Sequence, residues 1–384
     1  MIVTLAFYIK GQNFSGQLYE LIPVLFITGG THPDHDSINT FRKRFLRELA
    51  DLFVRLLQVA HGMGVLKLGG ISMDGTKIKA NASKHKAMSW EYACKLEEQL
   101  RSEVEALIKR AESESGQGKQ EIDIPAELLR RETRLQKIAE VKAELEQRAA
   151  KRYAQEQADY AAKLKEREEK EQERGRKLGG KPPKAPEPGP QAKDQANFTD
   201  GDSRIMPTAG GFEQAYNAQA SVDIPTMLII SQHVSQNPND KQDVVPALDA
   251  FSRLPDDLGS IARAAADSGY FSKDNNQHFE AAGIEPYLPN GRQYHNPTLE
   301  ECFAKAPEAP KNADSVVAMA HRMKTEAGKK FYAQRKSTVE PVFGIIKEVM
   351  GFRRFMLRGL DAVQVEWTLV CMASNLKRLC VLSF

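Results

Sequence analysis

The pattern of apolar and polar residues predicts where the strands of a folded domain begin. Residues 65–80 are expected to form two short β-strands, because apolar and polar side chains partly alternate from Ile71 onward. Asp74 lies near the point where these strands meet, and Gly75 beside it lets backbone or ligand approach closely. Lys77 and Lys79 then face the same side of the strand. The alternative interpretation is a β-turn that contains Asp-Gly.

The stretch before these strands has helical spacing. Apolar residues recur at helical intervals from Ile38 to Ala60, and Asp36 or Ser37 can cap the start of the helix. We therefore predict an N-terminal helical region over residues 1–63.

Strand and helix patterns alternate again after residue 198. The predicted strands cover 214–223, 226–234, 261–266 and 284–288, and the predicted helices cover 240–254 and 273–282. An antiparallel meander followed by βαβ units gives an α/β fold with a mixed sheet and flanking helices. This is the element order of a ribonuclease H-like domain, which would comprise residues 64–88 and 198–384.

A long, charged segment interrupts this domain. Residues 91–178 carry 21 acidic and 20 basic residues, and their apolar positions recur at helical spacing. A stretch with five prolines follows at 179–190. We predict that residues 89–197 are an insertion made of a charged helical hairpin and a linker, too sparse in apolar residues to form a core of its own.

Composition limits the functions that can be argued. The chain has 384 residues and a formal net charge of only +3, so a case for nucleic-acid binding must rest on local charge. Four scattered cysteines without a CxxC pair argue against zinc and against a disulfide framework, and fit a reducing cytoplasm. No apolar run approaches the length that crosses a bilayer, so we expect no membrane association.

Three carboxylates on separate elements suit metal-assisted chemistry. Asp267 follows a predicted strand, where α/β sheets bind ligands, and Glu340 lies at a predicted helix start marked by Pro341. With Asp74, they could hold two Mg²⁺ ions for phosphoryl transfer, because Mg²⁺ prefers oxygen ligands. The simpler interpretations are a turn-forming Asp267 and a Glu340 that interacts with the helix dipole.

The charge around Glu340 is basic. Residues 321–384 contain twelve Lys or Arg against five Asp or Glu. A cation cluster beside an acidic metal site suits a nucleic-acid backbone, although a solvated basic helix face would give the same pattern. The residues expected to line a DNA groove beside the carboxylates are Lys77, Lys79, Tyr332, Arg335, Lys336, Lys347, Arg353 and Arg354.

Several motifs occur in the order found in a known family. They are MDGTKIKANAS at 73–83, FEQAYNAQA at 212–220, NDKQ at 239–242, ADSGYF at 266–271 and RKSTVEPVFG at 335–344, with Lys347 beyond. Together they resemble bacterial insertion-sequence DDE transposases over residues 31–384. The resemblance implies that Asp74, Asp267 and Glu340 are catalytic and bind metal on a ribonuclease H-like fold.

Two features depart from the family pattern. Lys336, rather than Arg335, lies four residues before Glu340, so either residue could take the role of the family's arginine. Residues 1–26 look cut short or scrambled beside the longer N-terminal helical region of the family, which is thought to bind transposon ends. The predicted region 1–63 is therefore a truncated candidate for DNA-end binding.

The resemblance implies Mg²⁺-dependent cleavage of a DNA strand at the end of an insertion sequence, followed by attack of the 3′-hydroxyl on target DNA. Mn²⁺ could replace Mg²⁺. The expected partners are double-stranded DNA, both inverted repeats and target, and a second copy of the chain, in the cytoplasm at the bacterial nucleoid. Two alternatives stay open: a nuclease of the same fold without strand transfer, and a catalytically idle DNA-binding remnant.

Overall fold

The computed structural model describes residues 40, 44–113, 123–177, 179–208, 210–291 and 314–383. The predicted helix start at Asp36 or Ser37, and residues 1–26, lie outside the described residues. The chain divides into two units, one made of residues 1–81 and 205–384 and the other of residues 82–204.

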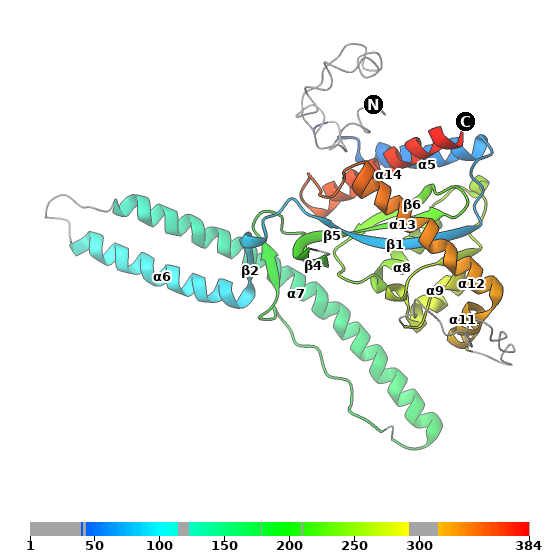
Figure 1. Cartoon of the computed structure of the whole chain (residues 1–384). Coiled ribbons are helices and arrows are strands. Elements are labelled where there is room, and N and C mark those ends of the chain that lie inside the picture. Colours follow the sequence, from blue (N-terminus) through cyan, green and yellow to red (C-terminus); the bar gives the residue numbers. More distant parts are fainter. Residues whose placement is uncertain are drawn as a thin grey trace, which may run out of the picture. The chain divides into compact units, whose positions relative to one another are not determined.

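The first unit is built on a mixed sheet with the strand order β4-β5-β1-β7-β8, in which β6 also pairs with β5 (Figure 1). Its strands are β1 (Gly70–Lys79), β4 (Arg204–Thr208), β5 (Gly211–Asp223), β6 (Ile229–Ser235), β7 (Arg263–Ala265) and β8 (Glu285–Tyr287). The long strand β5 runs antiparallel to β1 and β6, whereas β1, β7 and β8 are parallel. The predicted α/β class with a mixed sheet is therefore confirmed.

The prediction of two strands within residues 65–80 is wrong, and so is the β-turn interpretation. Leu66 and Leu68 are buried, but their N–H groups bond to the carbonyls of Ala60 and Leu258 at 3.1 and 3.2 Å rather than to a strand. Ladder pairing begins only at Gly70, and β1 then runs without interruption for 10 residues. The buried Leu66 and Leu68 therefore anchor an irregular segment, and Asp74 lies inside one continuous strand.

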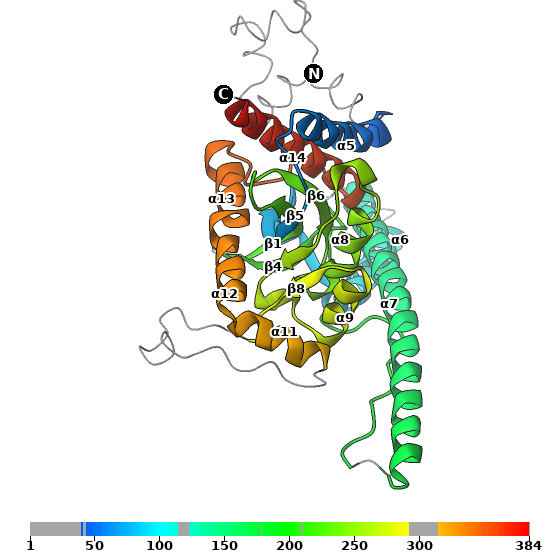
Figure 2. The same cartoon turned by 90° about the vertical axis from the view of Figure 1, so that its right-hand side faces the viewer.

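Helices cover both faces of this sheet. They are α5 (Leu46–Gly62), α8 (Val244–Phe251), α9 (Lys273–Ala281), α11 (Ser315–Lys324), α12 (Glu326–Ala333), α13 (Val339–Gly344) and α14 (Leu360–Leu382). Figure 2 shows α12 and α13 on one side of the sheet and α8 and α9 on the other. The buried helix α14 packs against α5 and β6, where Asn375 exchanges hydrogen bonds of 2.8 and 2.7 Å with the backbone of Ile229.

The second unit holds the charged segment. It contains α6 (Trp90–Ser113), α7 (Ile124–Arg174) and a small sheet of β2 (Ala87–Ser89) with β3 (Gln195–Asn197). The side chain of Asp123 caps α7 by accepting from Ala126 N, and Gly175 ends it with φ +63°. The prediction that this segment has no core of its own is wrong, because two small groups of buried side chains pack within it. They are Met88, Ala93, Leu96, Leu100 and Ile138, and Val141, Leu145 and Ala196.

Candidate active site

The parallel pairing of β1 with β7 brings two of the predicted carboxylates to the place where that pairing ends, which we call the sheet end. The pairing of the two strands ends at Ser72 and Ala265, so Asp74 and Asp267 each lie two residues beyond it. Open α/β sheets gather ligands at this carboxyl end of their parallel strands. Asp267 is also a turn-former, as the simpler interpretation held, because its Oδ1 accepts from Gly269 N at 2.8 Å.

Two glycines let other side chains approach these aspartates. A Cβ at Gly75 would lie 2.6 Å from Asp240 Oδ1 and 2.1 Å from Gln219 Nε2. A Cβ at Gly269 would lie 2.9 Å from Asp267 Oδ1 and 3.4 Å from Asp240 Oδ2. Real Cβ atoms do not come as close as the contacts at Gly75, so a side chain there would displace the ends of Gln219, Asp240 and Asn217.

Arg335 connects the sheet end to Glu340. Its Nη1 lies 3.4 Å from Asp74 Oδ2, and its Nη2 lies 3.0 Å from Glu340 Oε1 on the first turn of α13. Its guanidinium is largely buried and also lies 6.0 Å from the ring centre of Tyr332. Lys336 is exposed. Of these two residues, Arg335 is therefore the one that contacts Asp74 and Glu340.

The site carries more negative charge than its cations neutralise. Burial raises the pKa of Asp74 to about 7; Arg335 opposes this shift, and the charges of Asp267 and Asp240 add to it. Burial and the same acidic neighbours raise the pKa of the fully buried Tyr270 well above its ordinary value. Carboxyl groups with perturbed pKa values near a sheet end are a mark of functional sites.

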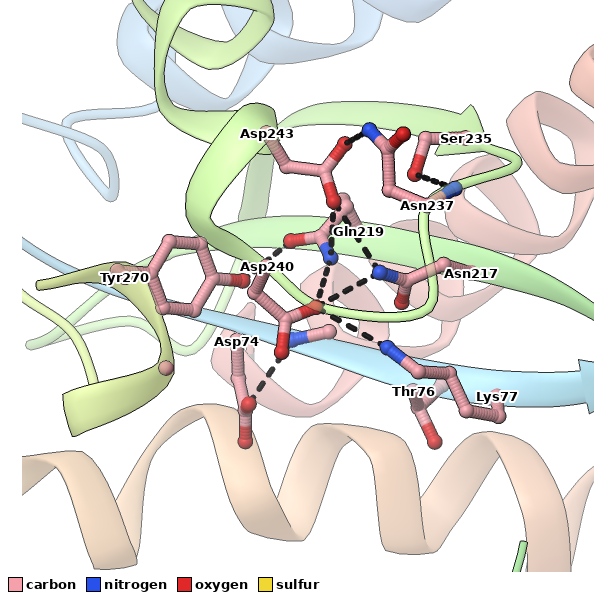
Figure 3. Close-up of polar contacts among 12 residues, drawn as sticks. Asp74, Thr76, Lys77, Asn217, Gln219, Ser235, Asn237, Asp240, Asp243 and Tyr270 are labelled. Atoms are coloured by element: carbon pink, nitrogen blue, oxygen red, sulfur yellow. Dashed lines mark hydrogen bonds and ion pairs between the residues drawn. The ribbon is translucent and has the colours of Figure 1, made fainter. Parts of the chain in front are cut away.

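Several polar residues of this centre were not among the predicted site residues (Figure 3). Asp240 immediately precedes the short 3₁₀ turn η2 (Lys241–Asp243). Its carboxylate accepts hydrogen bonds from Asn217 Nδ2 at 2.7 Å and Gln219 Nε2 at 2.8 Å. Tyr270, at the end of the turn η4 (Ser268–Tyr270), donates to Gln219 Oε1. The signal that could have found them was present, because these residues lie in or next to the motifs at 212–220, 239–242 and 266–271.

The structure brings some of the predicted DNA-binding residues to the carboxylates. Arg335 and the half-buried Lys347 reach β1, where Lys347 donates to Thr76 Oγ1. Tyr332 lies beside Arg335. Lys77 bonds to Asp240 of this centre at 3.2 Å. Lys79 bonds to Glu213 at 3.1 Å, Arg353 to Glu348 and Arg354 to Asn81.

The carboxyl-terminal part of this arrangement has a match among known proteins. Residues 307–380 match the family model of the transposase DDE domain. The resemblance to DDE transposases that the motifs predicted is thereby confirmed. The matched region includes Tyr332, Arg335, Glu340 and Lys347, whereas Asp74 and Asp267 lie outside it. No curated protein and no solved structure matches the chain.

The donor chemistry of the site suits a hard divalent cation. Its acidic side chains offer only oxygen atoms, which Mg²⁺ and Ca²⁺ prefer. The buried Asn217 Oδ1 has no hydrogen-bond donor among the described residues, and it approaches Gly75, as Asp240 Oδ1 does. Within the described ranges, no three His, Cys, Asp or Glu side chains converge closely enough to hold a metal, and Arg335 lies between Asp74 and Glu340. None of the helices in these ranges is long and apolar enough to span a membrane.

Proposed function

We propose that the protein is a DNA transposase that cleaves DNA at the ends of an insertion sequence and joins the released end to target DNA. The observation that carries this proposal is the match of residues 307–380 to the transposase DDE domain. The two aspartates at the sheet end support it, because Asp74 contacts Arg335 of the matched region and Asp267 lies at the end of the neighbouring strand β7. In this proposal residues 64–88 and 198–384 are a ribonuclease H-like catalytic domain, and the mixed sheet supports that assignment.

The proposed roles follow from the chemistry of each side chain. Asp74, Asp267 and Glu340 would hold the divalent cation, Mg²⁺ or Mn²⁺, with two ions as the expected number. The bound cation supplies positive charge beside the scissile phosphate. Arg335 and Lys347 would bind phosphate oxygens, because the guanidinium and ammonium groups donate hydrogen bonds to them.

The proposed reaction has two phosphoryl transfers. Water attacks the phosphorus at the element end, the bond from phosphorus to the 3′-oxygen breaks, and a free 3′-hydroxyl remains. That hydroxyl then attacks a phosphorus of the target strand, which releases a 3′-hydroxyl of the target and joins the two DNAs. Both steps need the same in-line geometry, so one carboxylate site can serve both.

The other parts of the chain have proposed roles that depend on this reaction. Residues 1–63 are a candidate for binding DNA ends, residues 64–88 and 198–384 are the catalytic domain, and residues 89–197 are an insertion within it. Two copies of the chain would act together on paired ends, and the place of action would be the bacterial nucleoid in the cytoplasm.

A labelled duplex that contains the DNA bordering the gene tests the proposal. With Mg²⁺, we expect a nicked strand with a 3′-hydroxyl, and a larger joined product when target DNA is added. EDTA should remove both products. A nicked strand without any joined product would make the protein a nuclease. Binding without either product would make it an idle DNA-binding remnant.

A further inference from the structure

A loop that directly precedes α14 presents positive charge to solvent. Residues 351–359, which we call the arginine loop, lie in the first unit. The buried rings of Phe352 and Phe355 pack edge to face with their centres 5.3 Å apart, so the loop is anchored in the domain. The exposed residues of the loop include three arginines, Arg353, Arg354 and Arg358.

Glu366 of α14 fixes the backbone of the arginine loop from inside. It is only 1% exposed, and its carboxylate accepts hydrogen bonds from Met356 N at 3.0 Å and from Leu357 N at 2.9 Å. A buried carboxylate is costly unless its oxygens are hydrogen-bonded, and a charged acceptor makes bonds to backbone N–H groups strong. Glu366 therefore holds the loop in one conformation.

Asn81, two residues beyond the end of β1, contacts the arginine loop at three points. Its Nδ2 donates to Met356 O at 2.7 Å, which fixes the amide. Its Oδ1 accepts from Arg354 Nη2, and its backbone carbonyl accepts from Arg358 Nε at 3.0 Å. One asparagine therefore orients two guanidinium groups.

The two arginines that Asn81 orients keep an uncompensated charge. Among the described residues, neither Arg354 nor Arg358 forms an ion pair with Asp or Glu, whereas Arg353 of the same loop pairs with Glu348. A guanidinium has several N–H donors, and a single bond to a neutral acceptor leaves others for an anion. Arg354 and Arg358 are therefore oriented without being neutralised.

The exposed side chain of Met356 adds an apolar group between these two arginines in the sequence. Its backbone N–H and carbonyl are both bonded, to Glu366 and to Asn81, while the residue is 54% exposed. A DNA strand alternates charged phosphates with less polar sugars, and proteins bind its backbone with cations and apolar side chains together. The arginine loop has both kinds of group.

We propose that the arginine loop is a preformed contact for the backbone of a DNA strand, in which Arg354 and Arg358 bind phosphate oxygens and Met356 contacts a sugar. Asn81 is a positioning residue, because it orients both guanidinium groups without touching the DNA. This inference rests on the proposed function, because it takes DNA as the ligand. The contact uses neither the carboxylates nor a cation, so it forms without Mg²⁺.

The salt dependence of DNA binding tests the two arginines. Binding of a labelled random-sequence duplex to the full chain is measured in EDTA over a salt series. Each neutralised phosphate contributes about 0.9 to the slope of log affinity against log salt. Arg354→Gln and Arg358→Gln should therefore each lower this slope by about 0.9, and an unchanged slope in either variant would overturn the proposed contact.

Arg353→Gln is the matched control for these two substitutions. It removes the same charge from the same loop, but this arginine is already neutralised by Glu348. We expect the slope to stay close to that of the unmodified protein. An equal decrease in all three arginine variants would mean that only the net charge of the loop matters, and it would overturn the contact assigned to Arg354 and Arg358.

Two substitutions of Asn81 test its positioning role. Asn81→Ala removes no charge, so the slope should be kept, while the Kd should rise by about 5-fold or more because two flexible side chains must then be ordered on binding. Asn81→Asp keeps the side-chain shape and adds a carboxylate beside both arginines, so it should lower the slope. An unchanged Kd in Asn81→Ala, or an unchanged slope in Asn81→Asp, would reject the role of Asn81.

The same measurements separate this inference from the proposed function. If the unmodified protein cleaves DNA in Mg²⁺ but the arginine variants keep its salt slope, only the arginine loop contact is wrong. If the slopes fall as expected but the unmodified protein does not cleave, the loop contact stands and the transposase activity is rejected. An unmodified protein that binds no duplex would reject both.

Discussion

The helical hairpin and the sheet end use charged side chains in opposite ways. On the hairpin, Glu97 accepts from Lys142 and Arg101 at 2.7 Å each, and these hydrogen bonds lower the pKa of its carboxyl. At the sheet end, burial outweighs the one arginine beside Asp74 and raises the pKa of that carboxyl to about 7. The hairpin pairs its charges near the surface, whereas the sheet end keeps a negative excess away from water.

This difference separates structural charge from functional charge. Ion pairs at helical spacing on an exposed face each contribute about 0.3–0.5 kcal/mol to the stability of a helix. This contribution is enough to explain the paired charges of the near-neutral hairpin. Buried carboxylates that repel one another destabilise the fold, so their presence calls for a ligand that neutralises them. The predictions below test whether the two regions differ in this way.

The largest expected effect is on catalysis. Glu340→Gln keeps the shape of the side chain and removes the charge that Arg335 contacts at 3.0 Å. We expect strand cleavage in Mg²⁺ to fall by at least about 100-fold, the range seen when one charge-stabilising group is removed from an active site. Single-turnover cleavage of a duplex with the bordering DNA measures the effect.

Glu348→Gln is the matched control for that substitution. Glu348 lies eight residues further along, is exposed and pairs with Arg353. It should cleave at the rate of the unmodified protein. Equal losses in the two variants would mean that a general loss of helix charge, and not the carboxylate site, explains the result.

The second expected effect is on stability and its pH dependence. Asp74 has a folded-state pKa of about 7 against 3.8 for the ordinary carboxyl, so its contribution is full below pH 4 and is lost as pH rises to 7. Asp74→Asn has no carboxyl group to ionise, so the variant does not lose stability in this way as pH rises. Without metal, we expect the variant to be more stable at pH 8 by on the order of a few kcal/mol, at about 1.4 kcal/mol per pKa unit. Denaturant unfolding in EDTA at pH 5 and pH 8 measures the difference.

The hairpin should show the opposite sign. The pKa of Glu97 is lowered, so its contribution is present at neutral pH and is lost as pH falls through the lowered value. Glu97→Gln should therefore destabilise slightly at pH 7, by less than about 1 kcal/mol, and become neutral in acid. If both variants shift stability in the same direction at pH 8, the contrast between the two regions does not hold.

The smallest expected effect is on the salt dependence of DNA binding. Lys347 is half-buried, donates to Thr76 Oγ1 and has a pKa that burial lowers. If it neutralises one phosphate, Lys347→Ala should reduce the slope of log affinity against log salt by about 0.9. It should weaken binding to end and random duplexes alike, because phosphate contacts carry no sequence information.

Lys95→Ala provides the comparison from the hairpin. Lys95 pairs with Glu91 at 2.6 Å on an exposed face and should leave the salt slope unchanged. An unchanged slope in Lys347→Ala, with a small loss of thermal stability, would mean that Lys347 only supports β1 through Thr76.

Sequence patterns predicted the mixed sheet because period-two alternation and βαβ order are local properties. Sequence patterns did not decide whether Arg335 or Lys336 lies beside Glu340. A spacing of four residues before Glu340 places a side chain beside it only if both residues lie on one continuous helix. Here α13 is preceded by a 3₁₀ turn, Gln334–Ser337, and by the non-helical Thr338 (φ −119°, ψ −83°). The number of residues between the basic side chain and Glu340 therefore does not tell which of the two is nearer.

The acidic network shows a second limit of sequence reasoning. Lys77 was predicted to contact DNA because it follows Asp74, yet its partner Asp240 lies 163 residues away. Such a partner depends on how β5 and the turn before α8 pack, which local periodicity does not describe. Asp240 lies in the motif at 239–242, but that motif did not indicate what the residue contacts.

Asp267 gives the most direct test of the central account, that a carboxylate site at the sheet end cleaves DNA with a divalent cation. It lies outside the matched region 307–380, so its role depends on the sheet geometry and the motif order. The measurement is cleavage of the bordering-DNA duplex in Mg²⁺ by Asp267→Asn and the unmodified protein, with DNA binding recorded in parallel. The account predicts that the variant binds DNA but does not cleave it; normal cleavage by the variant would contradict the account.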